Sequence, residues 1–241
     1  MLYVSLQAQV SEQNSQIGFQ CPPCGMDHCL VIRPDSGACP DCGMALIRSD
    51  ILKQTTKTVA ILLFDGVQIM DFTGPYEVFT FGRWNVYTIA RSKNALNTAG
   101  NLSVNPDYDF TDFPQPDIIV IPGGHELEPG TNDLELNWIK QQAEIVDNVM
   151  SVCNGAVSLA HAGLLKNMPA TTHHSAFERL KQTSPTTTVI RDKKWVDNGK
   201  IITAAGLSSG IDASLYLISR YRSIEEAEQI TRWLEYRWVK K

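Results

Sequence analysis

Short apolar runs along the chain predict buried β-strands. The clearest is residues 58–64 (TVAILLF), whose side chains leave no polar face, as in a strand covered on both sides. Further strands are expected at residues 85–90, 117–121, 149–152 and 186–190, and a hairpin at 194–204. Helices are expected at residues 72–82, 133–147, 154–165, 208–221 and 224–239. Because strands and helices alternate, the sequence predicts an α/β fold with a mostly parallel sheet covered on both faces.

The same pattern divides the chain into four segments. We expect a leader over residues 1–20, a four-cysteine module over 21–48, a polar linker over 49–57 and the α/β domain over 58–241. Residues 1–9 (MLYVSLQAQ) fit two interpretations, a frayed N-terminus or the tail of a signal peptide that starts upstream. The first predicts a cytoplasmic protein and the second an exported one.

Charge narrows the range of partners. The chain has 241 residues and a formal net charge of -5, and no run of Lys or Arg exceeds two residues. This pattern argues against nucleic acid and against an anionic membrane surface as partners. The longest apolar runs, residues 59–64 and 118–122, have the length of strands and are too short to span a bilayer. A small molecule is the expected substrate or ligand.

The cysteines point to a metal site. Five of the six fall within residues 21–42, where two C-x-x-C-G-M turns are separated by 14 residues. Each turn directs two thiolates at one point, and four thiolates form the tetrahedral set of a structural zinc ion. The predicted ligands are Cys21, Cys24, Cys39 and Cys42. Two disulfides or two redox-active pairs are the alternatives, and Cys29, beside Asp27 and His28, either replaces a ligand or stays a free thiol.

A reactive thiol is predicted where a strand runs directly into a helix. In residues 151–156 (SVCNGA), Cys153 ends an apolar strand and a helix of small residues follows at once, as in a nucleophile elbow. The helix end favours the thiolate, and its free N–H groups can hold an oxyanion. The alternative is a buried core cysteine.

Two further segments converge on the same carboxyl edge of the sheet, where open α/β proteins bind ligands. Gly123 and Gly124 end a predicted strand and leave backbone N–H groups open to a ligand, with His125 next to them. A tight turn explains these glycines equally well. Asp71 comes just before the helix expected at 72–82, either as an acid of the site or as a helix cap.

Six segments in fixed order carry a resemblance to a known family. They are FDGVQIMDFTGPYEVF, DIIVIPGG, SVCNGAVSLAHAGLL, ATTHH, GKIITAAGLSSGID and LEYRW, within about residues 58–238. Together they resemble the ThiJ/PfpI superfamily, which shares the class I glutamine-amidotransferase-like fold. They are most similar to the branch that holds isonitrile hydratase and the ligand-binding domains of AraC-type regulators. The resemblance implies a flavodoxin-like α/β/α sandwich that forms a homodimer.

The resemblance also implies roles for single residues. Cys153 matches the elbow nucleophile, Asp71 an acid beside the thiol, and Gly124 the oxyanion-hole glycine. Gly74 matches a backbone group that lines the same pocket, and His173, in TTHH, a histidine near the cysteine.

The position after the nucleophile departs from the family. It holds Asn154, where isonitrile hydratase has a threonine and the protease-like members a histidine, so a peptidase is not expected. Asn154 can still offer its N–H and its amide to catalysis or binding. A protonated Asp71 would favour the Cys153 thiolate by hydrogen bonding, so the two groups should titrate as a pair. Gly123 and His125 are expected to contact the substrate, and His161 is expected only to pack.

The N-terminal segment has its own resemblance. FQCPPCGMDHC and GACPDCGMALI are similar to heavy-metal-binding and zinc-ribbon modules, but Cys24 stands where the heavy-metal version has a histidine. This favours structural zinc, whose ligation would carry the folding of so small a module.

Two functions of different class follow. The first is an enzyme in which Cys153, assisted by Asp71, attacks a small electrophile such as an isonitrile, a 2-oxoaldehyde or an activated amide, without an organic cofactor. The second is a non-catalytic module that binds a small molecule or senses redox state or metal through the same pocket. The sequence shows no helix-turn-helix segment after its last predicted helix, which argues against an AraC-type regulator.

Overall fold

The structure is a computed structural model that describes residues 17–21 and 31–240. The chain divides into two compact units, Met1–Thr56 and Lys57–Lys241. Among the described residues, no helix combines the length and the apolar character that crossing a bilayer requires.

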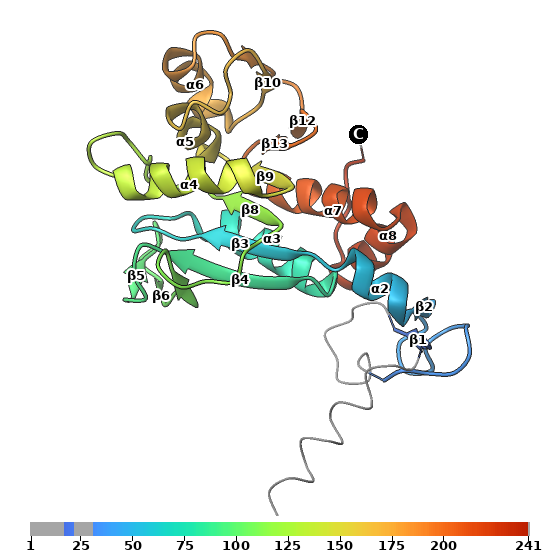
Figure 1. The fold of residues 1–241 in the computed structure, drawn as a ribbon. Coiled ribbons are helices and arrows are strands. Elements are labelled where there is room, and N and C mark those ends of the chain that lie inside the picture. The colour runs from blue at the N-terminus through green and yellow to red at the C-terminus, as the bar shows by residue number, and fades with distance from the viewer. Residues whose placement is uncertain (1–16, 22–30, 241) are drawn as a thin grey trace, which may run out of the picture. The chain divides into compact units, whose positions relative to one another are not determined.

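In the described part of the N-terminal unit, regular structure is limited to three short elements. Strand β1 (Phe19–Gln20) pairs antiparallel with β2 (Ile47–Arg48), and helix α2 (Ser49–Thr55) follows directly (Figure 1). Residues 49–57, expected to be an unstructured linker, are therefore mostly helical. This helix was not predicted because most of its residues are polar, although its Leu52 side chain is buried.

The larger unit is built on a seven-stranded sheet with the strand order β12-β13-β9-β8-β3-β4-β7. Its strands are β3 (Thr58–Leu62), β4 (Asn85–Ala90), β7 (Tyr108–Asp109), β8 (Ile118–Ile121), β9 (Asn148–Ser151), β12 (Trp195–Asp197) and β13 (Ile201–Ala204). Every neighbouring pair is parallel except β12 and β13, which form the predicted hairpin. Strands β8 and β9 are buried along their whole length, as apolar runs covered on both faces should be.

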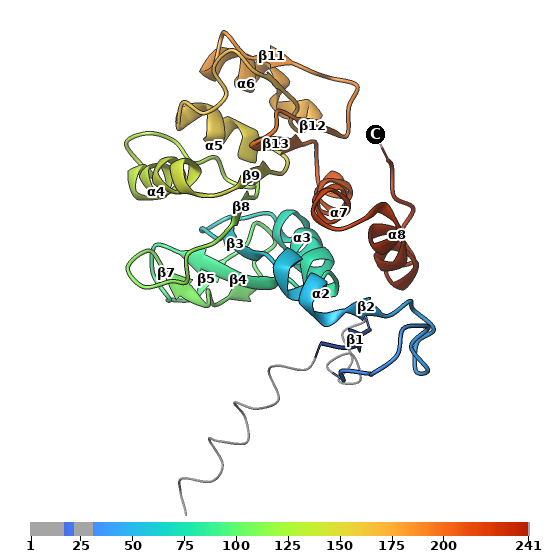
Figure 2. The same ribbon diagram turned by 45° about the vertical axis from the view of Figure 1, so that its right-hand side comes forward.

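Helices cover both faces of this sheet. They are α3 (Ile69–Phe81), α4 (Asp133–Ile145), α5 (Gly155–His161), α6 (Phe177–Thr183), α7 (Ser209–Tyr221) and α8 (Ile224–Trp233). Helix α3 packs against α7 and α7 against α8, whereas α5 packs against α4 and α6. Figure 2 shows α4, α5 and α6 on one side of the sheet and α3, α7 and α8 on the other. The predicted flavodoxin-like α/β sandwich is thereby confirmed.

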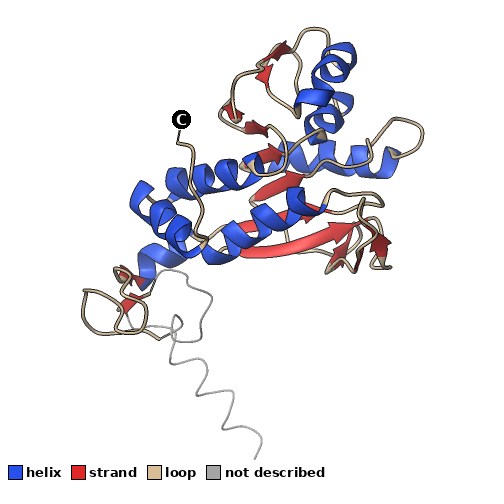
Figure 3. Cartoon of the chain, turned by 180° about the vertical axis from the view of Figure 1, so that it is seen from behind, coloured by secondary structure: helices blue, strands red, loops and turns tan. Residues whose placement is uncertain are grey.

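Most of the short elements outside the main sheet were not predicted. The strand expected at 186–190 is present, but it is only two residues long, Thr188–Val189. Strand β5 (Leu96–Asn97) pairs with β6 (Ser103–Val104), and β10 (Pro169–Ala170) pairs with β11 (Thr188–Val189) (Figure 3). A short 3-10 helix, η2 (His174–Ala176), leads into α6. Elements of two or three residues are too short to show a periodic pattern.

The first helix of the sandwich starts earlier than predicted. It begins at Ile69 rather than at 72, so Asp71 lies within its first turn and not before it. The Thr73 side chain lies within the helix and donates to the Ile69 carbonyl at 2.8 Å. A carboxylate in the first turn is favoured by the helix dipole, which lets Asp71 serve both the helix and the site beside it.

Candidate active site

Cys153 lies on a strained turn between β9 and α5. Its φ is 57°, a left-handed conformation that costs a residue with a side chain about 1–2 kcal/mol. The surrounding backbone holds it there, because the Cys153 N–H donates to the Ala205 carbonyl at 2.8 Å and the Gly155 N–H to the Val152 carbonyl at 3.0 Å. A Cβ at Gly155 would lie 2.2 Å from the Ile121 carbonyl oxygen, so this turn requires a glycine after the elbow.

Asp71 is completely buried beside the thiol. One carboxylate oxygen, Oδ2, accepts the Gly123 N–H at 3.0 Å, across 52 positions of the sequence. Burial raises the pKa of Asp71 to about 6, against the opposing effect of hydrogen bonds from Gly123 and Cys153. The structure thus brings together the acid and the thiol that the sequence pointed to separately.

The thiol is not a thiolate at rest. Burial and the charge of Asp71 raise the pKa of Cys153 to about 12, although the backbone N–H groups of Asn154 and Leu207 act in the opposite direction. From about pH 6 upward the pair therefore holds one proton, which lies on sulfur. The sequence led us to expect a proton shared by Asp71 and Cys153 and a thiolate favoured by the helix end, but burial outweighs the helix end here.

The two glycines after β8 do not leave their N–H groups open, contrary to our expectation. The Gly123 N–H is taken by Asp71 at 3.0 Å, and the Gly124 N–H donates to Asn154 Oδ1 at 2.8 Å. Asn154 Nδ2 donates back to the Gly124 carbonyl at 2.8 Å, which closes a two-bond clamp. Gly124 is therefore not a free oxyanion-hole donor, and both ends of the Asn154 amide are bound to the Gly124 backbone.

The remaining predicted residues lie in different places. His173 lines the pocket above Cys153, packs over Gly206 and contacts Ser175 Oγ through Nδ1 at 2.8 Å. His125 packs its ring against Gly66, and it does not line that pocket.

Gly74 was expected to line the pocket of the thiol, but it is not among the residues that line that pocket. It lies on α3 against Ile211 and lines a separate hollow with Met70, Leu234 and Tyr236. Helix α3 packs against α7, which carries Ile211.

The pocket has a volume of about 350 Å³. Four residues that were expected at the site line this pocket: Gly124, Cys153, Asn154 and His173. Its other lining residues are Gln68, Glu126, Ser175, Ala176, Arg179 and Leu207. Glu126 follows the glycine turn by two positions, which is a weak signal, and nothing in the sequence pattern marks Arg179 or Leu207.

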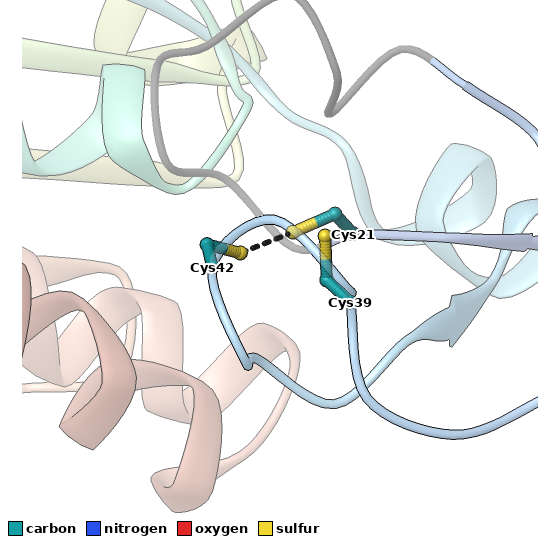
Figure 4. A group of neighbouring side chains, drawn as sticks. All are labelled: Cys21, Cys39 and Cys42. Atoms are coloured by element: carbon teal, nitrogen blue, oxygen red, sulfur yellow. Dashed lines mark hydrogen bonds between the residues drawn. The ribbon is translucent and has the colours of Figure 1, made fainter.

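Three of the four predicted metal ligands converge in the N-terminal unit (Figure 4). The sulfur atoms of Cys21, Cys39 and Cys42 all lie within 4.8 Å of one another, and those of Cys21 and Cys42 are 3.1 Å apart. Cys21 and Cys39 are buried and form a small core with Met44. The expected fourth ligand, Cys24, lies outside the described residues, as do His28 and Cys29.

The fold and the elbow define the class of protein: an α/β sandwich with a cysteine between a central strand and a helix, next to a buried acid. Residues 57–220 match the DJ-1/PfpI family, and the chain belongs to that family, as the resemblance implied.

Individual relatives fall into more than one functional class. The chain is 33% identical over 181 residues to isonitrile hydratase of Pseudomonas putida, covering 74% of this chain and 78% of that one. It is 25% identical over 178 residues to the HTH-type transcriptional regulator CdhR of Pseudomonas aeruginosa, covering 70% of this chain and 52% of the regulator. A crystal structure of a ThiJ/PfpI family protein from Pseudomonas syringae superposes with a TM-score of 0.68 at 25% identity, covering 77% of each chain.

Proposed function

We propose that the larger unit is a cysteine-dependent enzyme that hydrates a small electrophile, with an isonitrile as the preferred class. The observation that carries this proposal is a half-buried Cys153 that lines an open pocket and lies beside the buried Asp71. The similarity to isonitrile hydratase supports the choice of substrate class.

In the first step, the one proton that Cys153 and Asp71 hold between them leaves the sulfur as it attacks and is transferred to the substrate. As Cys153 Sγ attacks the terminal carbon of the isonitrile, Asp71 takes the thiol proton and delivers it to the same carbon. One S–C bond and one C–H bond form, the carbon–nitrogen triple bond becomes a double bond, and a thioimidate is attached to Cys153.

The second step uses the same groups in reverse. Asp71 takes a proton from a water molecule, whose oxygen attacks the thioimidate carbon, and Asp71 passes that proton to the nitrogen. The S–C bond then breaks as the hydroxyl of the adduct becomes a carbonyl; its proton passes through Asp71 to the sulfur, and an N-substituted formamide leaves.

The hydrogen bonds already made by Gly123 and Gly124 support an isonitrile, rather than an amide or a 2-oxoaldehyde, as the substrate class. Attack on a carbonyl creates an oxyanion, and preorganised N–H donors usually stabilise it. Here the N–H groups of Gly123 and Gly124 are already bound by Asp71 and Asn154. Addition to an isonitrile carbon develops no oxyanion in its first step, so it does not need those donors.

The test is formamide production from small alkyl isonitriles, followed by NMR, together with a search for the Cys153 adduct by mass spectrometry. We expect turnover that is half-maximal near pH 6 and level above it, because below this pH Asp71 is protonated and cannot accept the thiol proton. Absence of both formamide and adduct across pH 5–9 would contradict the proposal.

The similarity to the HTH-type transcriptional regulator CdhR supports a second candidate function. In this alternative the larger unit is a non-catalytic module that binds a small ligand. A thiol whose pKa is raised is a poor resting nucleophile, which also suits binding. Saturable binding of an isonitrile without formamide release would favour this candidate.

For the N-terminal unit we propose a structural zinc ion held by Cys21, Cys39 and Cys42 with Cys24 as fourth ligand. The support is the convergence of three sulfur atoms in a unit whose buried core consists largely of those cysteines. Zinc would supply cross-linking of this unit and no chemistry at Cys153.

Metal removal tests the zinc proposal. We expect one zinc per chain by elemental analysis, and we expect a strong chelator to make the module thiols reactive while Cys153 alkylation is unchanged, because the two units are separately compact. Cys42→Ser should lose the zinc, whereas Cys153→Ser, its matched control, should keep it. Purified protein without zinc, or with these thiols in disulfides, would refute the site.

A further inference from the structure

Three charged side chains form a group of ion pairs at the pocket that Cys153 lines: Arg179, Glu126 and Glu128. Arg179, from α6, pairs with Glu126 at 3.0 Å and also with Glu128, both from the segment that follows β8. Arg179 and Glu126 line the pocket, and the Glu126 side chain is 23% exposed against 48% for Glu128. Glu126 is thus the more enclosed of the two acids and the one that an entering molecule meets.

The charges of this group do not cancel. One guanidinium faces two carboxylates, which leaves one net negative charge. His173 adds none near neutral pH, because burial and the neighbouring His174 lower its pKa. The Cys153–Asp71 pair holds one proton and contributes a second negative charge. No other lining residue is charged, so the field in the pocket is negative.

We propose that this pocket selects its electrophile by charge, with Glu126 as the specificity-determining residue. Substrates that carry a neutral hydrogen-bonding group or a cation enter, and substrates that carry a carboxylate are excluded. The polar groups of Gln68, Ser175 and Arg179 line the wall and can hydrogen-bond such a substituent. The inference rests on the proposed function only in taking Cys153 as the reacting atom.

Alkylation of Cys153 tests this selection without any turnover. Iodoacetamide, iodoacetate and 2-bromoethylamine are neutral, anionic and cationic probes of one thiol, and peptide mass spectrometry of the full-length protein isolates Cys153 from the other cysteines. Each rate is divided by the rate of the same reagent with a free cysteine derivative. At low ionic strength we expect iodoacetate to be slower than iodoacetamide by about threefold to tenfold, with 2-bromoethylamine favoured, and salt should shrink both differences.

Substitutions of Glu126 test whether this residue causes the difference between the alkylation rates of the charged and neutral reagents. Glu126→Gln should raise the iodoacetate rate relative to iodoacetamide by about threefold or more and lower that of 2-bromoethylamine. Glu126→Asp keeps the charge and should keep the selection, which separates charge from a loss of packing. Glu228→Gln, on the exposed face of α8, removes the same charge elsewhere and should change neither ratio.

Three results would overturn the inference: equal normalised rates for iodoacetate and iodoacetamide, ratios unchanged by Glu126→Gln, or no alkylation of Cys153 by any probe. An iodoacetate preference that Arg179→Gln abolishes would also overturn it, since the pocket would then take carboxylates. Charge selection without isonitrile turnover would refute the hydratase proposal and leave this inference standing.

Discussion

Cys153→Ser should abolish the proposed isonitrile hydration, with an expected loss of at least about 10⁴-fold in kcat/KM. A serine hydroxyl is a far weaker nucleophile than a thiol and a far poorer leaving group from the intermediate. The fold should persist, because the elbow is held by backbone hydrogen bonds of Cys153 and Gly155 rather than by the sulfur atom. Formamide production and circular dichroism on the same preparation measure both quantities.

Cys42→Ser is the matched control, since it removes a thiol from the other unit and should leave hydration unchanged. Retention of more than a few per cent of the activity in Cys153→Ser would mean that another group performs the attack.

Asp71→Asn is expected to abolish the proposed hydration and at the same time to stabilise the protein. Hydration should fall by about 10²–10⁴-fold, because the amide cannot accept the thiol proton. Burial raises the pKa of Asp71 from 3.8 to about 6, so ionising this carboxyl in the folded state costs up to about 3 kcal/mol. The amide keeps an acceptor for the Gly123 N–H and avoids that cost.

The sign of the stability effect fixes its pH dependence. A folded pKa above the unfolded value means that Asp71 destabilises the protein increasingly as the pH rises through 6, and not at all below about 3.8, where both states are protonated. Calorimetry should show a higher Tm for Asp71→Asn than for the native chain at pH 8, and a smaller difference at pH 5. Equal destabilisation at both pH values would instead make the carboxyl a structural hydrogen-bond acceptor.

The sequence predicted the fold well where the chain is buried on two faces. Strand β8 is an uninterrupted apolar run and β3 is apolar after Thr58, and such runs have few alternatives in an α/β protein. Strands β4 and β9 contain polar residues but are mostly buried, and they were predicted too. It failed for η2 and β7, which are too short for periodicity, and for α2, whose residues are polar. The early start of α3 was missed because Pro75 is typical of the first turn of a helix, whereas here it lies inside the helix, six residues after Ile69.

The candidate site was predictable in its residues but not in their hydrogen bonds. Cys153 and Asp71 were expected at one edge because the carboxyl ends of parallel strands meet there. Their roles, and His173 altogether, came from the resemblance to the family. Whether Gly124 offers its N–H depends on the side-chain conformation of Asn154, which lies 30 positions away. Pairing across such distances cannot be read from spacing along the chain.

The clamp between Asn154 and Gly124 bears on how activities diverge in this fold. Both hydrogen bonds of the clamp come from one side chain, so a single codon change at position 154 releases the Gly124 N–H. The released N–H would face the elbow as a donor for a carbonyl oxygen, while the thiol and its acid stay in place. An evolutionary path from hydration of an isonitrile carbon to acyl transfer therefore need not rebuild the catalytic pair, and in laboratory evolution position 154 is the first one to randomise.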